Sequence, residues 1–120
     1  MTINTLLVAN RGEIARRIFR TAKSMGMVCV AVYADADSNE PFVKEADKSI
    51  RLPANYLDIE AIIDAAKKTR SDAIHPGYGF LSENASFAKA VTKAGINWVG
   101  PSPEVIEAMG DKIEAKKIAH

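Results

Sequence analysis

The segment from His75 to Asn84, HPGYGFLSEN, concentrates side chains that can exchange protons or form hydrogen bonds. Pro76 stiffens the chain where it leaves an apolar run, and its nitrogen cannot donate a hydrogen bond. Gly77 and Gly79 permit left-handed backbone and the close approach of a ligand. Taken alone, the spacing favours a tight connection in which His75 bonds the backbone and the aromatic side chains pack. The edge of a binding site is the alternative, since loops often carry binding residues.

The other candidate sites are weaker in residue type or in spacing. His75 and Glu83 lie eight residues apart across a turn, which matches no metal-ligand spacing, so no metal site is predicted. The first predicted strand-to-helix turn contains only Gly12, one of the glycines that the dinucleotide-binding fingerprint requires. Glu13 would also repel a phosphate at the start of the following helix. A dinucleotide-binding domain is therefore a less favoured alternative.

Elements that alternate between apolar runs and amphipathic segments must position these residues, and that is the pattern of βαβ units. The predicted fold class is α/β, a Rossmann-like parallel sheet flanked by helices, with ligands beyond the carboxyl ends of the strands. Ser82 is placed at the N-cap of a helix, and Asp35 and Asp37 in a solvated turn after the second strand. Strands are expected at residues 5–9, 27–33, 49–52, 73–74 and 96–99, and helices at 13–25, 42–46, 59–69, 85–94 and from 104.

The first predicted helix is amphipathic. Apolar residues recur on it at helical spacing and are expected to face the sheet: Ile14, Ile18, Phe19, Ala22 and Met25. Arg11, Arg16, Arg17 and Arg20 give the helix a basic exposed side. Such a side is either a solvated face or part of an interface, because arginine pairs with planar carboxylates and is enriched at interfaces. Both interpretations remain open on the sequence alone.

The composition restricts the class of protein. The chain has 120 residues and is 48% hydrophobic, enough for one compact domain with a buried core. Its 16 basic residues nearly balance its 15 acidic ones, so no field that would recruit nucleic acid is expected. No apolar run approaches the ~20 residues that span a bilayer. One cysteine and the lack of a basic stretch before an apolar segment predict a cytoplasmic protein of bacterial type.

The carboxyl end, residues 111–120, consists of good helix formers with no glycine or proline to end a helix. It predicts a helix that leads into further sequence. We therefore expect the chain to be the front part of a longer protein.

Segments along the chain together resemble the biotin carboxylase family. The resemblance lies in Val8–Ile18 (VANRGEIARRI), in HPGYGFLSEN, in Val99-Gly100-Pro101 and in Met109–Lys112 (MGDK), in the family's order. It covers almost the whole chain. It implies that residues 1–110 form the amino-terminal, pre-ATP-grasp domain, and that residues 111–120 begin the helix leading into an ATP-grasp region that is missing from this chain.

The resemblance also implies an activity. Biotin carboxylases are ligases that use ATP, Mg²⁺ and bicarbonate to carboxylate a ureido nitrogen of protein-linked biotin, with carboxyphosphate as the intermediate. The parent could be a free carboxylase subunit, the α chain of an acetyl- or propionyl-CoA carboxylase, or a pyruvate carboxylase. Expected partners are a biotin carboxyl carrier domain, a carboxyltransferase and a second copy in a homodimer. The isolated fragment is expected to be inactive, because the family's magnesium-binding carboxylates and glycine-rich lid belong to later domains.

Site residues follow from the same resemblance. Lys112 matches the family lysine that contacts ATP. Tyr78, Gly79 and Glu83 match positions at the rim of the biotin and bicarbonate pocket. Arg17 and Arg20 lie on the helix that contributes to the family's dimer interface. No complete catalytic set and no metal ligand are expected in this chain, and a non-catalytic binding or assembly module stays the alternative function.

Overall fold

The computed structural model describes residues 3–106. They form a five-stranded sheet in the order β3-β2-β1-β4-β5, in which every neighbouring pair is parallel. The strands are β1 Thr5–Val8, β2 Val28–Tyr33, β3 Lys48–Arg51, β4 Ala73–His75 and β5 Asn97–Trp98. The helices are α1 Gly12–Ser24, α2 Pro41–Glu45, α3 Ile59–Lys68 and α4 Ala85–Lys93, with a short 3₁₀ turn, η1, at Asp35–Asp37.

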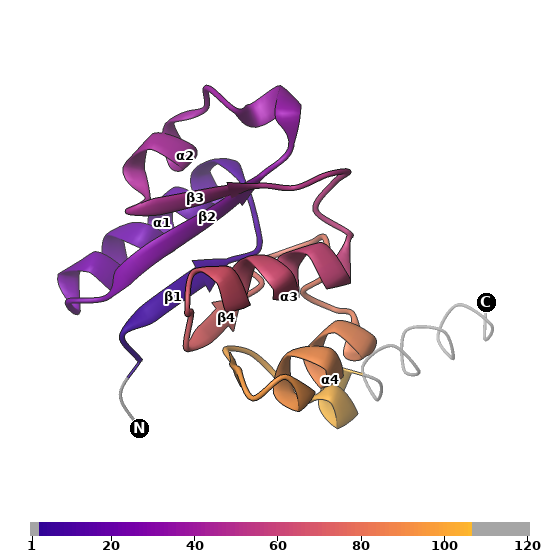
Figure 1. The fold of residues 1–120 in the computed structure, drawn as a ribbon. Helices are drawn as coiled ribbons and strands as arrows, with labels where there is room; N and C mark the ends of the chain where they lie inside the picture. The colour runs from indigo at the N-terminus through magenta and orange to yellow at the C-terminus, as the bar shows by residue number, and fades with distance from the viewer. Residues whose placement is uncertain (1–2, 107–120) are drawn as a thin grey trace, which may run out of the picture.

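The helices divide between the two faces of the sheet. α1 and α2 lie on one face, and α3 and α4 lie on the other (Figure 1). The central strands are covered on both faces, which is why β1 and β2 read as continuous apolar runs. Leu7, Val8, Val30 and Val32 are fully buried. The predicted α/β sheet flanked by helices is confirmed.

Polar side chains begin the two helices of the second face. The Asp58 carboxylate accepts a hydrogen bond from the Ala61 amide at 3.1 Å and caps α3. At α4 the Asn84 side chain accepts from the Phe87 amide at 3.0 Å. The prediction that Ser82 caps α4 is therefore wrong. The amide of Ser82 instead bonds the Gly79 carbonyl within the preceding turn, and the helix begins at Ala85 as predicted.

The apolar side of α1 does not face the core as a single stripe. Phe19 and Ala22 are buried, as predicted, but Met25 is 67% exposed, and Ile14 and Ile18 are only partly buried. On this face α1 packs against β1 and β2, and β4 and β5 follow beyond β1 in the sheet. The expectation that all five apolar residues face the sheet is wrong, because part of the apolar stripe lies beside the strands that α1 covers and stays accessible to solvent.

Because β1 and β4 are parallel neighbours, their carboxyl ends lie at the same edge of the sheet, the edge at which the sequence predicts ligands. No helix within residues 3–106 is long and apolar enough to cross a membrane. The predicted boundary at residue 110 and the helix expected at residues 111–120 lie outside the described residues.

Candidate functional site

The loop that follows β4 lies against the turn that follows β1. Val8 and His75 are partners in the parallel ladder, and the amide of Ala9 donates to the His75 carbonyl at 2.9 Å. Residues 76–84, which we call the β4–α4 loop, therefore begin beside Asn10 and Arg11. In open α/β sheets this carboxyl edge is where ligands bind.

The start of the loop is a tight turn. Gly77, Gly79 and Phe80 all have positive φ, of 67°, 71° and 47°. The amide of Gly77 donates to Nδ1 of His75 at 3.0 Å, so Nδ1 carries no proton. Burial lowers the pKa of His75, which agrees with a neutral ring. The predicted backbone bond of His75 is confirmed.

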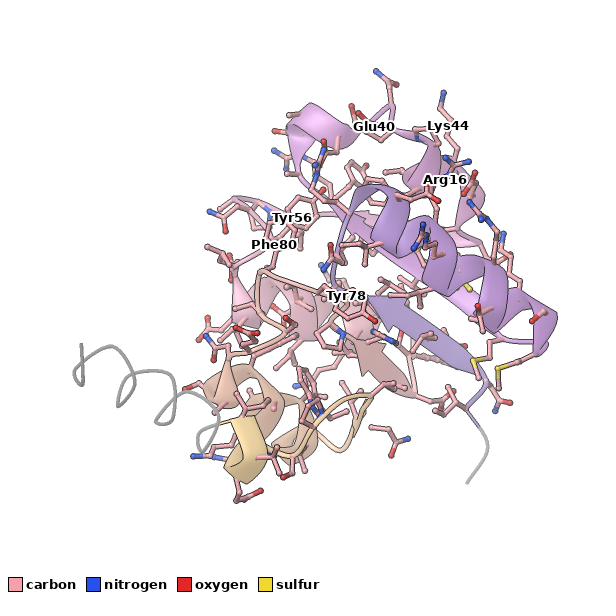
Figure 2. All side chains as sticks on the ribbon, turned by 180° about the vertical axis from the view of Figure 1, so that it is seen from behind. Arg16, Glu40, Lys44, Tyr56, Tyr78 and Phe80 are labelled. Atoms are coloured by element: carbon pink, nitrogen blue, oxygen red, sulfur yellow. The ribbon has the colours of Figure 1, made fainter. Side chains whose placement is uncertain are left out.

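The aromatic side chains of the loop behave differently from each other. Tyr78 is 76% exposed, and within residues 3–106 no hydrogen bond holds its hydroxyl, so the prediction that it packs is wrong. Phe80 contacts Tyr56, with ring centroids 5.2 Å apart. Figure 2 shows Phe80 turned toward Tyr56 and Tyr78 standing apart from them. The loop thus holds one aromatic ring and presents the other.

Asn10 holds the loop from the first turn. Its side chain is buried and donates to the carbonyl oxygens of Pro76 at 2.9 Å and Tyr78 at 2.7 Å. Its own carbonyl oxygen accepts from the Arg11 amide at 2.8 Å. We call Asn10 and its two loop carbonyls the amide clamp. The sequence interpretation missed it, although a polar residue directly after a buried strand is a signal to be followed.

The far side of the loop is supported through charged residues. Arg11 makes a bidentate pair with Asp37, at 2.7 Å for each bond, and the Tyr56 hydroxyl donates to the same carboxylate at 2.6 Å. The Tyr56 ring contacts the ring of Phe80 in the β4–α4 loop. We call Arg11, Asp37 and Tyr56 the charged brace.

The charged brace shifts the titration of its members. Hydrogen bonding to Arg11 holds the pKa of Asp37 below its usual value, and Asp37 in turn raises the pKa of Arg11. Burial, together with the bond to Asp37, raises the pKa of Tyr56 to about 12. The prediction that Asp37 is solvated is wrong, because its side chain is only 9% exposed and its carboxylate is bonded by Arg11 and by the Tyr56 hydroxyl. Asp35 is exposed as predicted and pairs with Arg51.

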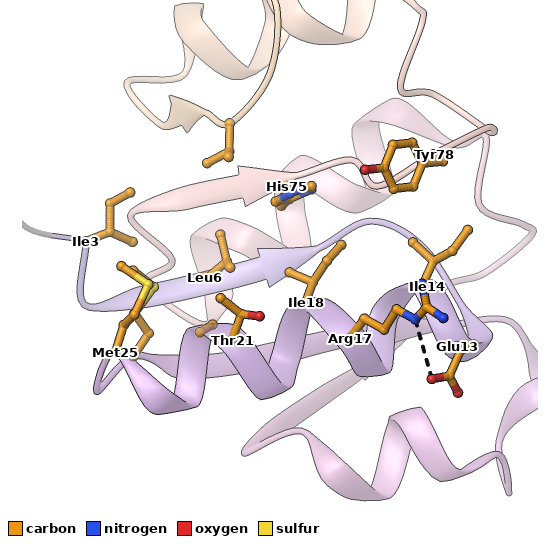
Figure 3. A pocket seen from close by; sticks show the side chains of 13 residues that line it. Ile3, Leu6, Glu13, Ile14, Arg17, Ile18, Thr21, Met25, His75 and Tyr78 are labelled. Atoms are coloured by element: carbon orange, nitrogen blue, oxygen red, sulfur yellow. Dashed lines mark ion pairs between the residues drawn. The ribbon is translucent and has the colours of Figure 1, made fainter.

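An apolar groove opens beside the loop, on the α1 face of the sheet. Its volume is about 530 Å³. Tyr78 and His75 border it on the side of the loop, and Arg17 and Glu13 form an ion pair at its rim, with 3.7 Å between Arg17 Nε and Glu13 Oε1 (Figure 3). The apolar lining includes Ile3, Leu6, Ile14, Ile18, Met25 and Val99.

The structure brings some of the predicted site residues together. Tyr78 and Gly79 are neighbours at the tip of the β4–α4 loop, and a side chain built on Gly79 would meet no atom within 4 Å. Glu83 is exposed further along the same loop. Lys112, the predicted ATP-binding residue, lies outside the described residues. Within residues 3–106 no group of three His, Cys, Asp or Glu side chains is arranged to hold a metal ion.

The predicted interface residues lie on the exposed side of α1. The side chains of Arg17 and Arg20 are 76% and 63% exposed, and both approach Glu13, Arg20 at 3.2 Å. Arg16 also approaches Glu13, at 3.4 Å, but turns toward α2 and pairs with Glu45 at 2.8 Å. Arg11, predicted on the same side, instead pairs its guanidinium with Asp37. Arg17 and Arg20 are thus the accessible part of the basic side.

Comparisons with known proteins agree on one family. A family model described as "Biotin carboxylase, N-terminal domain" matches residues 2–106. The mitochondrial propionyl-CoA carboxylase alpha chain of Mus musculus is 48% identical over 98% of this chain and 17% of its own length. Biotin carboxylase 2 of Bacillus subtilis is 50% identical over 93% of this chain and 26% of its own length.

Solved structures give the same answer. A complete multifunctional pyruvate carboxylase from Rhizobium etli superimposes with a TM-score of 0.92 at 39% identity, covering 99% of this chain and 13% of that one. The biotin carboxylase domain of a single-chain bacterial carboxylase superimposes with a TM-score of 0.89 at 42% identity, covering 97% of this chain and 28% of that one. The chain thus spans only a small part of each relative.

Proposed function

The chain belongs to the biotin carboxylase N-terminal domain family, and from this membership we propose that the whole protein is an ATP-dependent biotin carboxylase. Such an enzyme would use bicarbonate and ATP to carboxylate biotin attached to a carrier. The observation that supports this most strongly is the family match over residues 2–106, together with identities of 48% to 50% to carboxylase chains.

We propose that the described residues contribute one wall of the biotin pocket, formed by Tyr78, Gly79 and Glu83. Tyr78 offers an aromatic ring and a hydroxyl that no other residue within 3–106 engages. Gly79 lets a ligand approach the backbone, because no side chain stands there. A ureido ring is planar, neutral and polar, so a ring with a hydroxyl and bare backbone suits it.

The phosphate chemistry is assigned to other parts of the whole protein. Residues 3–106 hold no group of metal-ligating side chains suited to Mg²⁺, and Glu13 stands at the start of α1, where a bound phosphate would otherwise be favoured. The described residues therefore do not fit the magnesium–ATP group. We assign contact with ATP to Lys112, and we expect the 120-residue chain alone to be inactive.

The partners proposed for the whole protein are a biotin carboxyl carrier domain and a carboxyltransferase. The comparisons include chains named for propionyl-CoA carboxylase and for pyruvate carboxylase, so both an acyl-CoA and a keto acid stand as acceptors. We propose a cytoplasmic location, supported by Cys29, a free and buried thiol that fits a reducing compartment. A mitochondrial location is the alternative, because some relatives are named as mitochondrial.

We also propose that the exposed side of α1 forms a homodimer contact through Arg17 and Arg20. A double Arg17→Glu, Arg20→Glu variant of the full-length protein should shift toward the monomer in sedimentation equilibrium, because reversed charges would oppose any carboxylates across the interface. Lys67→Glu, an exposed charge reversal on α3, is the matched control. An unchanged dimer in the double variant would exclude these arginines from the interface.

The activity is tested on the full-length protein. Hydrolysis of ATP should require bicarbonate and should rise when biotin is added, with phosphate release followed continuously. Lys112→Ala should raise the Michaelis constant for ATP. Absence of any biotin-dependent step in the wild-type protein would overturn the proposed function, and ATP hydrolysis by the 120-residue chain well above its own Lys112→Ala control would overturn the assignment of catalysis to other domains.

A further inference from the structure

Asn10 is the most deeply buried polar side chain at the carboxyl edge of the sheet, 1% exposed. It is joined to loop residues that follow it by 66 and 68 positions. We propose that Asn10 is a positioning residue for biotin carboxylation, one that sets the direction in which the β4–α4 loop presents Tyr78. This inference rests on the proposed function of the loop as a rim of the biotin pocket.

The hydrogen bonds of Asn10 specify an amide. One nitrogen, Nδ2, donates both of its hydrogens, to the carbonyls of Pro76 and Tyr78 at 2.9 and 2.7 Å. The oxygen accepts from the Arg11 amide at 2.8 Å. Aspartate has nearly the same shape, but its carboxylate is acceptor-only and would face two carbonyl oxygens. Only an amide of this length satisfies both sides of the contact.

Gly77 makes this approach possible. A Cβ built on Gly77 would lie 2.6 Å from Asn10 Nδ2 and 2.9 Å from Asn10 Cβ. The backbone there also has a φ of 67°, which side chains rarely adopt. Gly77 and the amide clamp are therefore one unit. The amide of Asn10 occupies the space that a side chain at position 77 would take.

Tyr78 depends on this unit for its orientation. Its side chain is 76% exposed, and within residues 3–106 no hydrogen bond holds its hydroxyl. Tyr78 is held instead through its backbone, because its carbonyl accepts a hydrogen bond from Asn10. Its two neighbours are also held: Gly77 packs closely against Asn10, and the Phe80 ring contacts Tyr56. Loss of the amide clamp would release the tip of the loop without altering the sheet beneath it.

The test compares Asn10→Asp and Asn10→Ser with Asn97→Ala in the full-length protein. Asn97 is a matched control, since its side-chain nitrogen also donates to a backbone carbonyl, that of Asp72 at 3.0 Å. It lies on β5, near the opposite ends of the strands. The readouts are kcat/KM for free biotin and the Michaelis constant for ATP, both from biotin-dependent ATP hydrolysis.

We expect Asn10→Asp to lower kcat/KM for free biotin by roughly 10- to 100-fold, the effect of misplacing a substrate-positioning group. The Asn10→Ser hydroxyl is too short to bond both carbonyls but places no charge against them, so this variant should lose less. The Michaelis constant for ATP should stay within about twofold of wild type in both, because a displaced loop tip alters the biotin side of the site. Asn97→Ala should match wild type in both constants.

Unchanged biotin kinetics in Asn10→Asp would overturn the inference. So would equal losses for biotin and ATP, because these indicate general damage to the fold. If Asn10→Asp is insoluble, Asn10→Ser decides by the same criteria. A wild-type protein without biotin-dependent activity would instead reject the proposed function, so the two failures are distinguishable.

Discussion

The β4–α4 loop is supported on its two sides by different chemistry, although the supporting residues, Asn10 and Arg11, are adjacent. The amide clamp is neutral, buried and bonded directly to the loop backbone. The charged brace is ionic and is partly open to solvent at Arg11, and within residues 3–106 its side chains reach the loop through the contact between Tyr56 and Phe80. We infer from this difference that the uncharged hydrogen bonds of Asn10 set the loop conformation, whereas the ion pair stabilises Tyr56, which the loop contacts through Phe80.

The largest effect is expected from Gly77→Ala, which attacks the amide clamp sterically. A positive φ and a Cβ 2.6 Å from Asn10 Nδ2 should together reduce the free energy of unfolding by about 3 kcal/mol. Gly79→Ala is the matched control, because Gly79 also has a positive φ but open space around it. It should cost about 1 kcal/mol. Equal losses by urea denaturation would show that the clamp imposes no steric requirement.

Asn10→Ala should come next, at about 2 kcal/mol, since two loop carbonyls lose their donor and a buried space opens. Because no charge is involved, the loss should be the same in low and high salt and between pH 5 and pH 8. Urea denaturation of wild type and variant across those conditions measures it. A loss that shrinks in high salt would mean that the clamp acts through the neighbouring Arg11.

Asp37→Asn should weaken the charged brace by about 1.5 kcal/mol at neutral pH, because the bidentate pair with Arg11 loses its charge. The folded pKa of Asp37 is lowered, so its contribution to stability is complete above its unfolded pKa of about 3.9. It is lost as the pH falls through the folded value. The difference between wild type and Asp37→Asn should therefore shrink under acid, as denaturation at pH 7 and pH 3 would measure. A constant difference would contradict the ionic account.

Tyr56→Phe should have the smallest effect, about 1 kcal/mol. It keeps the ring but removes the hydrogen bond that the hydroxyl donates to Asp37 and the one that it accepts from the Ala34 amide. The contact with Phe80 should survive, so kcat/KM for free biotin in the full-length protein should change less than in any Asn10 variant. A decrease in kcat/KM for free biotin as large as that of Asn10→Asp would show that the charged brace matters to the loop as much as the amide clamp.

The fold could be predicted from the sequence to within a few residues at most boundaries, and the reason is burial. β1 and β2 are apolar along their length because both faces are covered. α3 begins directly after its N-cap residue, Asp58, as the sequence predicts. The prediction that Met25 is buried is wrong. Helical periodicity identifies the apolar side of α1 but does not show which residues of that side lie over the sheet.

The conformation of the candidate site could be predicted only where it depends on residues close together in sequence. The turn at Gly77 and the backbone bond of His75 follow from neighbouring residues. The role of Asn10 depends on β1 lying next to β4, which brings together residues more than sixty positions apart. The local sequence predicts a solvated Asp37 because Tyr56, whose hydroxyl bonds its carboxylate, comes 19 residues later. Contacts of this kind are set by the order of strands and not by local pattern.

Amide hydrogen exchange at Gly77 and Ser82 tests the central claim most directly, because both amides are bonded within the loop region, to His75 and to Gly79. In the full-length protein, Asn10→Asp should speed their exchange by about tenfold or more, the equivalent of losing one to two net hydrogen bonds. Asp37→Asn should leave both rates within about threefold of wild type, the brace being one contact removed from the loop backbone. Equal acceleration in the two variants, or acceleration only in Asp37→Asn, would contradict the claim that the amide clamp sets the loop.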